Sequence, residues 1–217
     1  MWIDVTVPLD GNPPRWPGSV GVTLDYANDL AGGEKTRDTV LTMDVHCGTH
    51  VEAAAHVSLR GLPMDSVNLD HLMGLVAVLD ATGHREVPKS LAGHIPQQVM
   101  GVLTRTDNSI KQLMGISDFE ESFVGWSVEF AEAVAALSQV RVAGADYLSI
   151  QPYGGNPRVH EVLLESGKAV LEGLDLSEVE PGVYEMCGLP LALPSREAAP
   201  ARVLLRPVLD SEMSVTR

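Results

Sequence analysis

Three of the chain's seven histidines lie within eleven residues of one another, and a glutamate stands between them. In an extended segment, alternate residues point to the same face. Read in this way from residue 40 onward, one face would be apolar and the other would gather imidazole and carboxyl groups. The apolar set is Leu41, Met43, Val45, Cys47 and Val51, and the polar set is Asp44, His46, Gly48, His50, Glu52 and His56.

Such a concentration of ionisable groups is costly unless a ligand compensates for it. Protonated imidazoles would repel one another, and a buried carboxylate needs a partner. A divalent cation meets both requirements, since neutral imidazole and carboxylate are ligands that suit zinc, manganese or iron. A cluster of solvated histidines that binds nothing is the alternative. The clustering favours a divalent metal, with zinc as the first choice and manganese as the second.

Four further blocks of sequence accompany the histidine segment HCGTHVEAAAH (46–56). They are WPG (16–18), GADYLSI (144–150), HEVLLESGKAVLEGLDL (160–176) and GLPLALPSREAAPARVLL (188–205). In this order they resemble the motifs of the cyclase family that includes bacterial kynurenine formamidases and isatin hydrolase. The histidine segment resembles the central family motif HxGTHxDxPxH, and WPG resembles the substrate loop of the family.

The resemblance implies a role for each of these residues. The implied metal ligands are His46, His50, Glu52, His160 and Glu172. His56 would be the general acid or base instead of a ligand, and its ordinary pKa, about 6.5, suits proton transfer. Trp16, in the segment that resembles the substrate loop, could form an aromatic wall for a planar substrate or could be a packed loop anchor.

The chain departs from the family pattern at four positions. Glu52 replaces the usual Asp, and Ala54 replaces the Pro that shapes the turn before His56. Ser19 follows WPG where Asp is common, and Gln151 replaces the acidic residue that often follows the Ser-Ile pair. These changes leave open which substrate is used and whether one or two metals bind.

Three functions remain open at this stage. The first is a metal-dependent hydrolase, similar to kynurenine formamidase, that acts on a carbon–nitrogen bond of a small, preferably aromatic, amide or cyclic amide. A metal can lower the pKa of a bound water from about 15.7 to about 7, and His56 could pass a proton to the leaving group. The second is a metal-dependent cyclase or dehydratase of a polyketide-type secondary-metabolite pathway. The third is a metal-binding member that has lost catalysis, although such a chain would be expected to lose these costly polar groups.

The elements that would position these residues are mainly strands. Runs rich in β-branched residues predict strands over 3–9, 20–26, 39–45, 75–81, 99–106, 140–150, 168–176 and 201–209. Helical spacing predicts helices over 127–139 and 157–167. This order indicates an α/β fold with a mixed sheet and few helices, in a single domain over residues 1–217. The resemblance implies that the domain is of the swivelling β/β/α type.

Composition and charge limit the kinds of molecule that this chain is expected to bind. A chain of 217 residues, 45% hydrophobic and 20% charged, can bury a globular core. The formal net charge of −14 argues against nucleic acid and anionic membranes and leaves a small-molecule substrate. Only two cysteines occur, no signal peptide is recognised and no apolar run reaches about 18 residues, so we expect a cytoplasmic location. The resemblance implies a homodimer or homotetramer.

Overall fold

The computed structural model describes residues 1–10 and 13–208. Its strands are β1 (Ile3–Asp4), β2 (Val22–Asn28), β3 (Asp38–Met43), β4 (His50–Glu52), β5 (Met73–Asp80), β6 (Glu86–Val87), β7 (Gly101–Arg105), β8 (Gly125–Trp126), β9 (Val142–Ala145), β10 (Ala169–Glu172), β11 (Gly182–Pro190) and β12 (Ala198–Pro207). Its α-helices are α1 (Asp107–Ile110), α2 (Val128–Ala135) and α3 (Arg158–Glu165). Short 3₁₀ helices occur at Leu30–Gly32, Ala54–His56, Met64–Ser66, Leu69–Leu72, Lys89–His94 and Leu113–Gly115.

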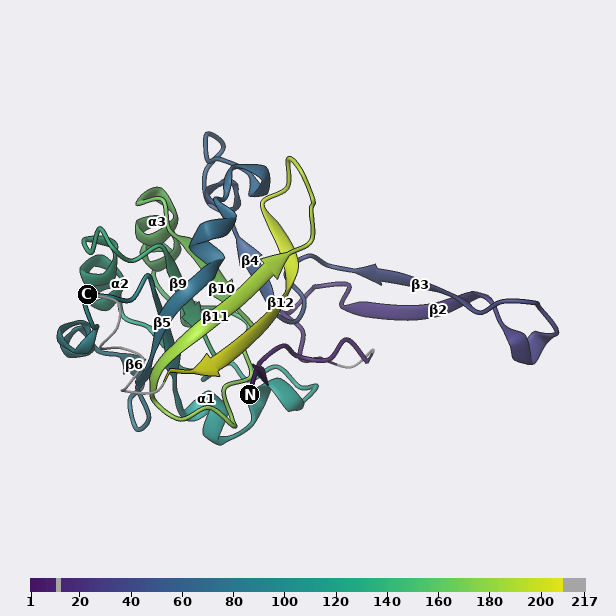
Figure 1. Ribbon diagram of the computed structural model, residues 1–217, viewed down its shortest axis with the longest axis horizontal. Helices are drawn as coiled ribbons and strands as arrows, with labels where there is room; N and C mark the ends of the chain where they lie inside the picture. Colours follow the sequence, from purple (N-terminus) through teal and green to yellow (C-terminus); the bar gives the residue numbers. More distant parts are fainter. Residues whose placement is uncertain (11–12, 209–217) are drawn as a thin grey trace.

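A mixed eight-stranded sheet forms the centre of the molecule (Figure 1). Its strand order is β1-β12-β11-β5-β7-β9-β10-β4, and β4 also pairs with β12, so the sheet closes into a barrel-like shape. Neighbours among β5, β7, β9 and β10 run parallel, whereas the remaining pairs are antiparallel. The predicted α/β fold with a mixed sheet is confirmed.

Alternation along the central strands divides the core into two parts. On β5, Val76 and Val78 join a cluster that also contains Leu171 of β10. Ala77 and Leu79 belong to a second cluster, which includes side chains of α2 and α3. Because successive side chains of a strand face opposite ways, a strand buried on both faces is apolar throughout. This accounts for the continuous apolar run over 75–79.

Both predicted helices are confirmed, with shorter bounds. Ser127 caps α2, because its side-chain oxygen accepts a hydrogen bond from the backbone N–H of Phe130 at 3.2 Å. Pro157 precedes α3, and Gly167 follows it in the left-handed conformation. The helix therefore ends where the chain turns back into β10, and His160 on α3 comes to lie beside that strand.

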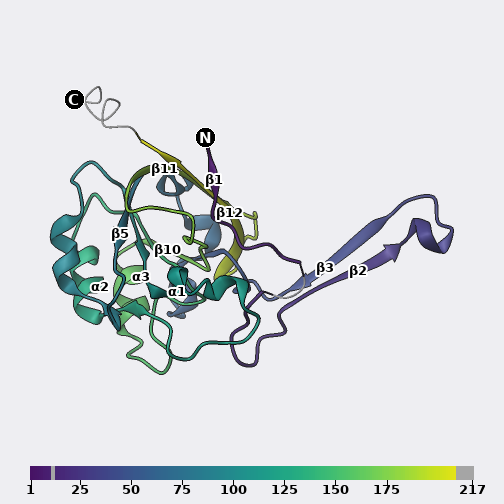
Figure 2. The same ribbon diagram turned by 90° about the horizontal axis from the view of Figure 1, so that it is seen from below.

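Strands β2 and β3 form a long arm that extends away from the body (Figures 1 and 2). The strands predicted over 20–26 and 39–45 are confirmed in type, but within the described part of the chain they pair only with each other. Leu24, Tyr26 and Leu41 of the arm are 46%, 56% and 45% exposed. The arm therefore presents large apolar side chains to solvent.

Several strand predictions differ from the structure. The segment 3–9 contains only the two-residue β1 and a single bridge from Thr6 to Leu174. The strand predicted over 140–150 ends at Ala145. Strand β11 was not predicted, because its internal Gly188 and terminal Pro190 interrupt the β-branched pattern. Strand β12 begins three residues before the predicted 201–209, and residue 209 lies outside the described residues.

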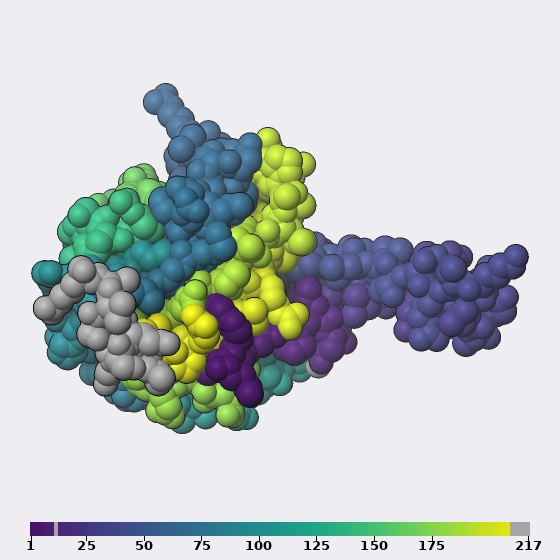
Figure 3. Space-filling model, viewed as in Figure 1, coloured from purple at the N-terminus to yellow at the C-terminus, as the bar shows by residue number. Residues whose placement is uncertain are grey.

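The described residues form a body built around the eight-stranded sheet and the arm of β2 and β3 that extends from it (Figure 3). The expected single domain over residues 1–217 includes residues 11–12 and 209–217, which lie outside the described residues. No helix among the described residues combines the length and the apolar character needed to cross a membrane.

Candidate metal centre

The segment that carries the histidines is not one continuous strand, so the prediction of a single extended face over 40–56 is wrong. Strand β3 ends at Met43, the chain then turns, and β4 begins at His50. Gly48 has a φ of 71°, a left-handed conformation that interrupts an extended strand. Alternation therefore holds only within β4, where His50 and Glu52 share one face and the residue between them joins the core on the other.

Thr49 fastens the end of this turn to the sheet. Its Oγ1 donates a hydrogen bond to the carbonyl oxygen of Gly173 at 2.5 Å and accepts one from the backbone N–H of Val7 at 2.9 Å. The chain passes so close to Gly173 that a Cβ there would lie 2.2 Å from the carbonyl oxygen of Gly48. The adjoining antiparallel pair of β4 and β10 then places His50 directly opposite Glu172.

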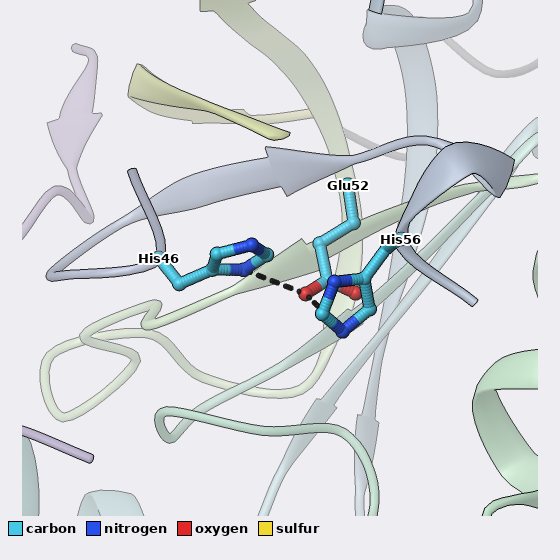
Figure 4. Close-up of side chains that lie close together, drawn as sticks. All are labelled: His46, Glu52 and His56. Atoms are coloured by element: carbon cyan, nitrogen blue, oxygen red, sulfur yellow. Dashed lines mark ion pairs between the residues drawn. The ribbon is translucent and has the colours of Figure 1, made fainter. Parts of the chain in front are cut away.

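Glu52 is the centre of the cluster on this face. Its Oε1 lies 3.0 Å from Nδ1 of His46, 3.6 Å from Nε2 of His50 and 3.4 Å from Nε2 of His56. Figure 4 shows the Glu52 side chain reaching from its strand toward His46 on the preceding turn and His56 at the end of the following 3₁₀ helix. Three successive local elements thus direct their side chains to one point.

A second pair of residues reaches the same point from later in the chain. Nε2 of His160 lies 3.3 Å from Oε2 of Glu52 and 2.9 Å from Oε1 of Glu172. Oε2 of Glu172 lies 3.4 Å from Nε2 of His50. The structure therefore brings together the five metal ligands that the resemblance implied, which are His46, His50, Glu52, His160 and Glu172. His56, the implied general acid or base, lies beside them.

The residues present fit a divalent metal ion. Glu52 is 1% exposed, and its Oε2 is a buried atom without a hydrogen-bond partner among the described residues. A buried carboxylate oxygen without a hydrogen bond lowers the stability of the fold, and a bound cation would remove this cost. The surrounding donors are imidazole nitrogens and carboxylate oxygens, the set that suits zinc or manganese.

The charges in the cluster shift the pKa values of both the carboxylates and the imidazoles. Burial by itself would raise the pKa of Glu52, but the imidazoles of His160, His46 and His50 lower it well below its usual value. Burial would lower the pKa of His50, but the carboxylates of Glu172 and Glu52 raise it to about 10. The two buried carboxylates therefore form a strongly negative site that attracts positive charge, either protons or a metal cation.

His56 has a different environment. Burial lowers the pKa of His56, although the charge of Glu52 opposes this effect. Its side chain is 33% exposed and lines the cavity beside the cluster. The ring is therefore neutral near pH 7 and can accept a proton from a molecule in that cavity.

The cavity has a volume of about 660 Å³. Its lining includes Trp16, Ser19, Asp44, His46, Glu52, His56, Gln151, His160 and Glu172. The ring of Trp16 packs edge-on against Phe119 and Tyr153, with centroid distances of 5.1 and 5.4 Å. Trp16 is thus anchored in an aromatic cluster and also lines the cavity, and its contact with a substrate stays a prediction.

Comparison with known families identifies the relatives of this site. The model of the Cyclase family ("Putative cyclase") matches residues 3–152. The chain belongs to the Cyclase family. Among the curated relatives of this Cyclase-family chain, Cyclase-like protein 2 of Oryza sativa subsp. japonica is 35% identical over 195 residues, which cover 86% of this chain and 71% of the relative. The family resemblance inferred from the sequence motifs is confirmed.

Solved structures extend the likeness to the whole Cyclase-family fold. One, described as a potential metal-dependent hydrolase with cyclase activity, is 28% identical with a TM-score of 0.79 and covers 94% of this chain and 96% of its own. Isatin hydrolase A from Labrenzia aggregata, bound to benzyl benzoate, is 21% identical with a TM-score of 0.75. That alignment covers 96% of this chain and 94% of the isatin hydrolase chain, and it shows a shared fold.

Two supports of this Cyclase-family site were missed in the sequence. Oε1 of Glu197 lies 3.6 Å from Nε2 of His46, although Glu197 precedes β12, far along the chain. Asp44, predicted only as a member of the polar face, accepts hydrogen bonds from the backbone N–H of His46 at 3.0 Å and from the hydroxyl of Ser19 at 2.8 Å. No local pattern marks Glu197, because only the pairing of β12 with β4 brings it near.

Asp146 does not contribute to the cluster. Its carboxylate accepts hydrogen bonds from the backbone and hydroxyl groups of Thr106 and Ser109 and from the side-chain amide of Asn108. It therefore fastens the start of α1 to the end of β9.

Proposed function

We propose that this Cyclase-family protein is a metal-dependent hydrolase that cleaves a carbon–nitrogen bond of a small aromatic amide or cyclic amide, as kynurenine formamidase does. The observation that carries the proposal is the buried Glu52 carboxylate, which lies within 3.6 Å of four imidazoles and has one oxygen with no hydrogen-bond partner in residues 1–10 and 13–208. The relative described as a potential metal-dependent hydrolase with cyclase activity supports the same class of chemistry.

Four side chains would hold the metal: His46, His50, Glu52 and Glu172. His50 offers Nε2, because its Nδ1 lies 3.0 Å from the carbonyl oxygen of Gly48 and donates to it. Glu172 offers Oε2, because its Oε1 already accepts a hydrogen bond from the backbone N–H of Ile150 at 2.7 Å. When bound there, zinc or manganese supplies Lewis acidity and the activation of a water molecule near neutral pH.

His56 would carry the proton. Its Nε2 lies 3.4 Å from Oε1 of Glu52, which orients the ring toward the centre and the adjoining cavity. In hydrolysis, His56 takes a proton from the attacking water and returns it to the leaving nitrogen of the substrate. Trp16 supports an aromatic substrate, because it offers a ring to the same cavity.

The test is the turnover of the His56→Ala variant. We expect kcat for hydrolysis of an aromatic formamide to fall by at least about 100-fold, the usual loss when a general acid or base is removed. Metal content should stay unchanged. Chelation should abolish turnover of the unchanged protein, and added zinc or manganese should restore it. His84→Ala, a substitution of an exposed histidine outside the cavity, is the matched control. Full turnover in His56→Ala would contradict the assigned role.

A metal-dependent cyclase or dehydratase is the second candidate, favoured by the family name and by the cyclase activity given for the relative. The reaction in isotopically labelled water separates the two. A hydrolase incorporates the label into its product, whereas ring closure with loss of water does not. A catalytically inactive metal-binding protein is the third candidate, and it would bind metal yet turn over none of a panel of amides, imides and lactones.

We also infer that the partner of the arm is a second copy of this chain. Cross-strand partners share a face, so Val22–Met43, Leu24–Leu41 and Tyr26–Thr39 form a mainly apolar face. A two-stranded hairpin alone is marginally stable in water, and this face needs cover. Every copy carries the same arm, so two copies can exchange arms around a two-fold axis. Each copy then covers the apolar face of the other copy's arm.

A further inference from the structure

The histidines of the cluster differ in what surrounds their outer ring nitrogens, meaning those that point away from Glu52. A neutral imidazole carries one proton, and only its other nitrogen can bind a metal. The outer Nδ1 of His50 lies 3.0 Å from the carbonyl oxygen of Gly48, which can only accept. The outer Nε2 of His46 faces the carboxylate of Glu197 at 3.6 Å. In the neutral form that metal binding requires, both rings therefore keep their proton outside and turn a lone pair toward the centre.

His160 has the opposite environment, because its outer Nδ1 faces the side-chain amide of Gln151. The same end of this amide lies 3.0 Å from the carbonyl oxygen of Asn156 and 3.3 Å from that of Pro157. Both carbonyls can only accept, so the amide nitrogen must occupy this position and not the amide oxygen. Its two N–H groups are shared among these carbonyls and Nδ1 of His160 at 3.3 Å, and because an amide nitrogen does not accept, Nδ1 must turn a lone pair toward it. The lone pair of His160 is thereby used outside the centre.

The proton of His160 must consequently lie on Nε2, inside the centre. From there it is donated to Oε1 of Glu172 at 2.9 Å. A single proton makes a single strong bond, which agrees with the unpartnered state of Oε2 of Glu52 only 3.3 Å away. The inner nitrogen of His160 thus has no lone pair for a metal.

We propose that Gln151 is a positioning residue that holds His160 as a hydrogen-bond donor to Glu172, so that His160 is not a ligand and the centre takes one divalent cation. The inference rests on the proposed function for the presence of that cation. It replaces the ligand role that the family resemblance implied for His160 and selects one metal where the sequence left one or two open.

The direct test is long-range ¹H–¹⁵N NMR of the zinc-loaded protein, together with elemental analysis. We expect one zinc per chain. His160 should show a protonated Nε2 and an Nδ1 without a zinc-induced shift. His46 should show a zinc-bound Nδ1 and His50 a zinc-bound Nε2. Two zinc ions per chain, or a zinc-bound Nε2 of His160, would overturn the inference while leaving the proposed function intact. A chain that binds no zinc would overturn both.

Two variants test the part played by Gln151. In Gln151→Glu, a carboxylate can accept the Nδ1 proton of His160, so the Nε2 lone pair turns inward and a second zinc should bind. An unchanged ring and a single zinc in this variant would refute the role of Gln151. In His160→Gln, an amide N–H can replace the donor to Glu172, so zinc affinity should fall by less than about 10-fold. His50→Gln, which removes a proposed ligand, should lose more than about 100-fold. Equal losses in these two variants would also refute the inference.

Discussion

At the scale of single residues, Glu52 connects the whole cluster, because both of its oxygens face imidazoles. We expect Glu52→Gln to weaken zinc binding by more than about 100-fold, since it removes the central negative charge and places an amide group beside the imidazoles. Isothermal titration against a competing chelator measures the change. Glu161→Gln is the control, because Glu161 also lines the cavity but contacts Arg158. Zinc binding by Glu52→Gln at the level of the control would remove Glu52 from the ligand set.

The imidazoles of the same cluster predict that metal binding depends on pH. Glu172 and Glu52 raise the pKa of His50 to about 10, so without a metal this ring is protonated at pH 7.5. A ligand nitrogen must lose its proton, so zinc binding releases it, and affinity should rise with pH until about pH 10. Calorimetry in two buffers with different ionisation enthalpies counts the protons released. Affinity that is constant between pH 6.5 and 8.5 would contradict this expectation.

At the scale of elements, the site depends on the contact between the turn before β4 and the end of β10. Thr49 makes that contact with two buried hydrogen bonds. Thr49→Val keeps the shape and leaves the N–H of Val7 and the carbonyl of Gly173 without this partner, so we expect a loss of about 2 kcal/mol in the free energy of unfolding. Chemical denaturation followed by circular dichroism measures it.

The control for this element is Thr23→Val, on the exposed polar face of the arm, which should change stability by less than about 0.5 kcal/mol. Similar effects of the two substitutions would show that Thr49 does not hold the turn in place. Because His50 follows Thr49 directly, a genuine loss at this contact should also weaken zinc binding.

At the scale of the whole molecule, the exposed apolar face of the arm leads us to expect an oligomer in which two copies exchange arms. Leu24→Glu places a charge on its apolar face and should convert the oligomer of the unchanged protein into a monomer, because a buried charge without a partner is costly. Thr23→Glu changes the neighbouring position on the polar face and should leave the mass unchanged. Analytical ultracentrifugation distinguishes these results. A monomeric unchanged protein, or equal behaviour of both variants, would exclude arm exchange.

Loss of the oligomer should also lower turnover, because both ends of the arm reach the cavity. Ser19 precedes β2 and Asp44 follows β3, both line the cavity, and Asp44 holds the turn of His46. An arm without its partner would leave these residues less firmly placed. A monomeric Leu24→Glu variant with unaltered kcat/KM would show that the site is complete in one chain.

The sequence by itself determined the kind of chemistry. Ligand type belongs to the side chain, so the clustering of His46, His50, Glu52 and His56 by itself predicted a divalent metal. The family motifs implied the role of each residue and added the later pair on α3 and β10. The tertiary structure decided how residues distant in the sequence come together, which local spacing does not reveal. The left-handed Gly48 broke the predicted strand, and the pairing of β4 with β10 and β12 placed the distant groups beside Glu52. The proton positions also depend on it, because a histidine's tautomer follows from which donors and acceptors the folded chain sets around each ring nitrogen.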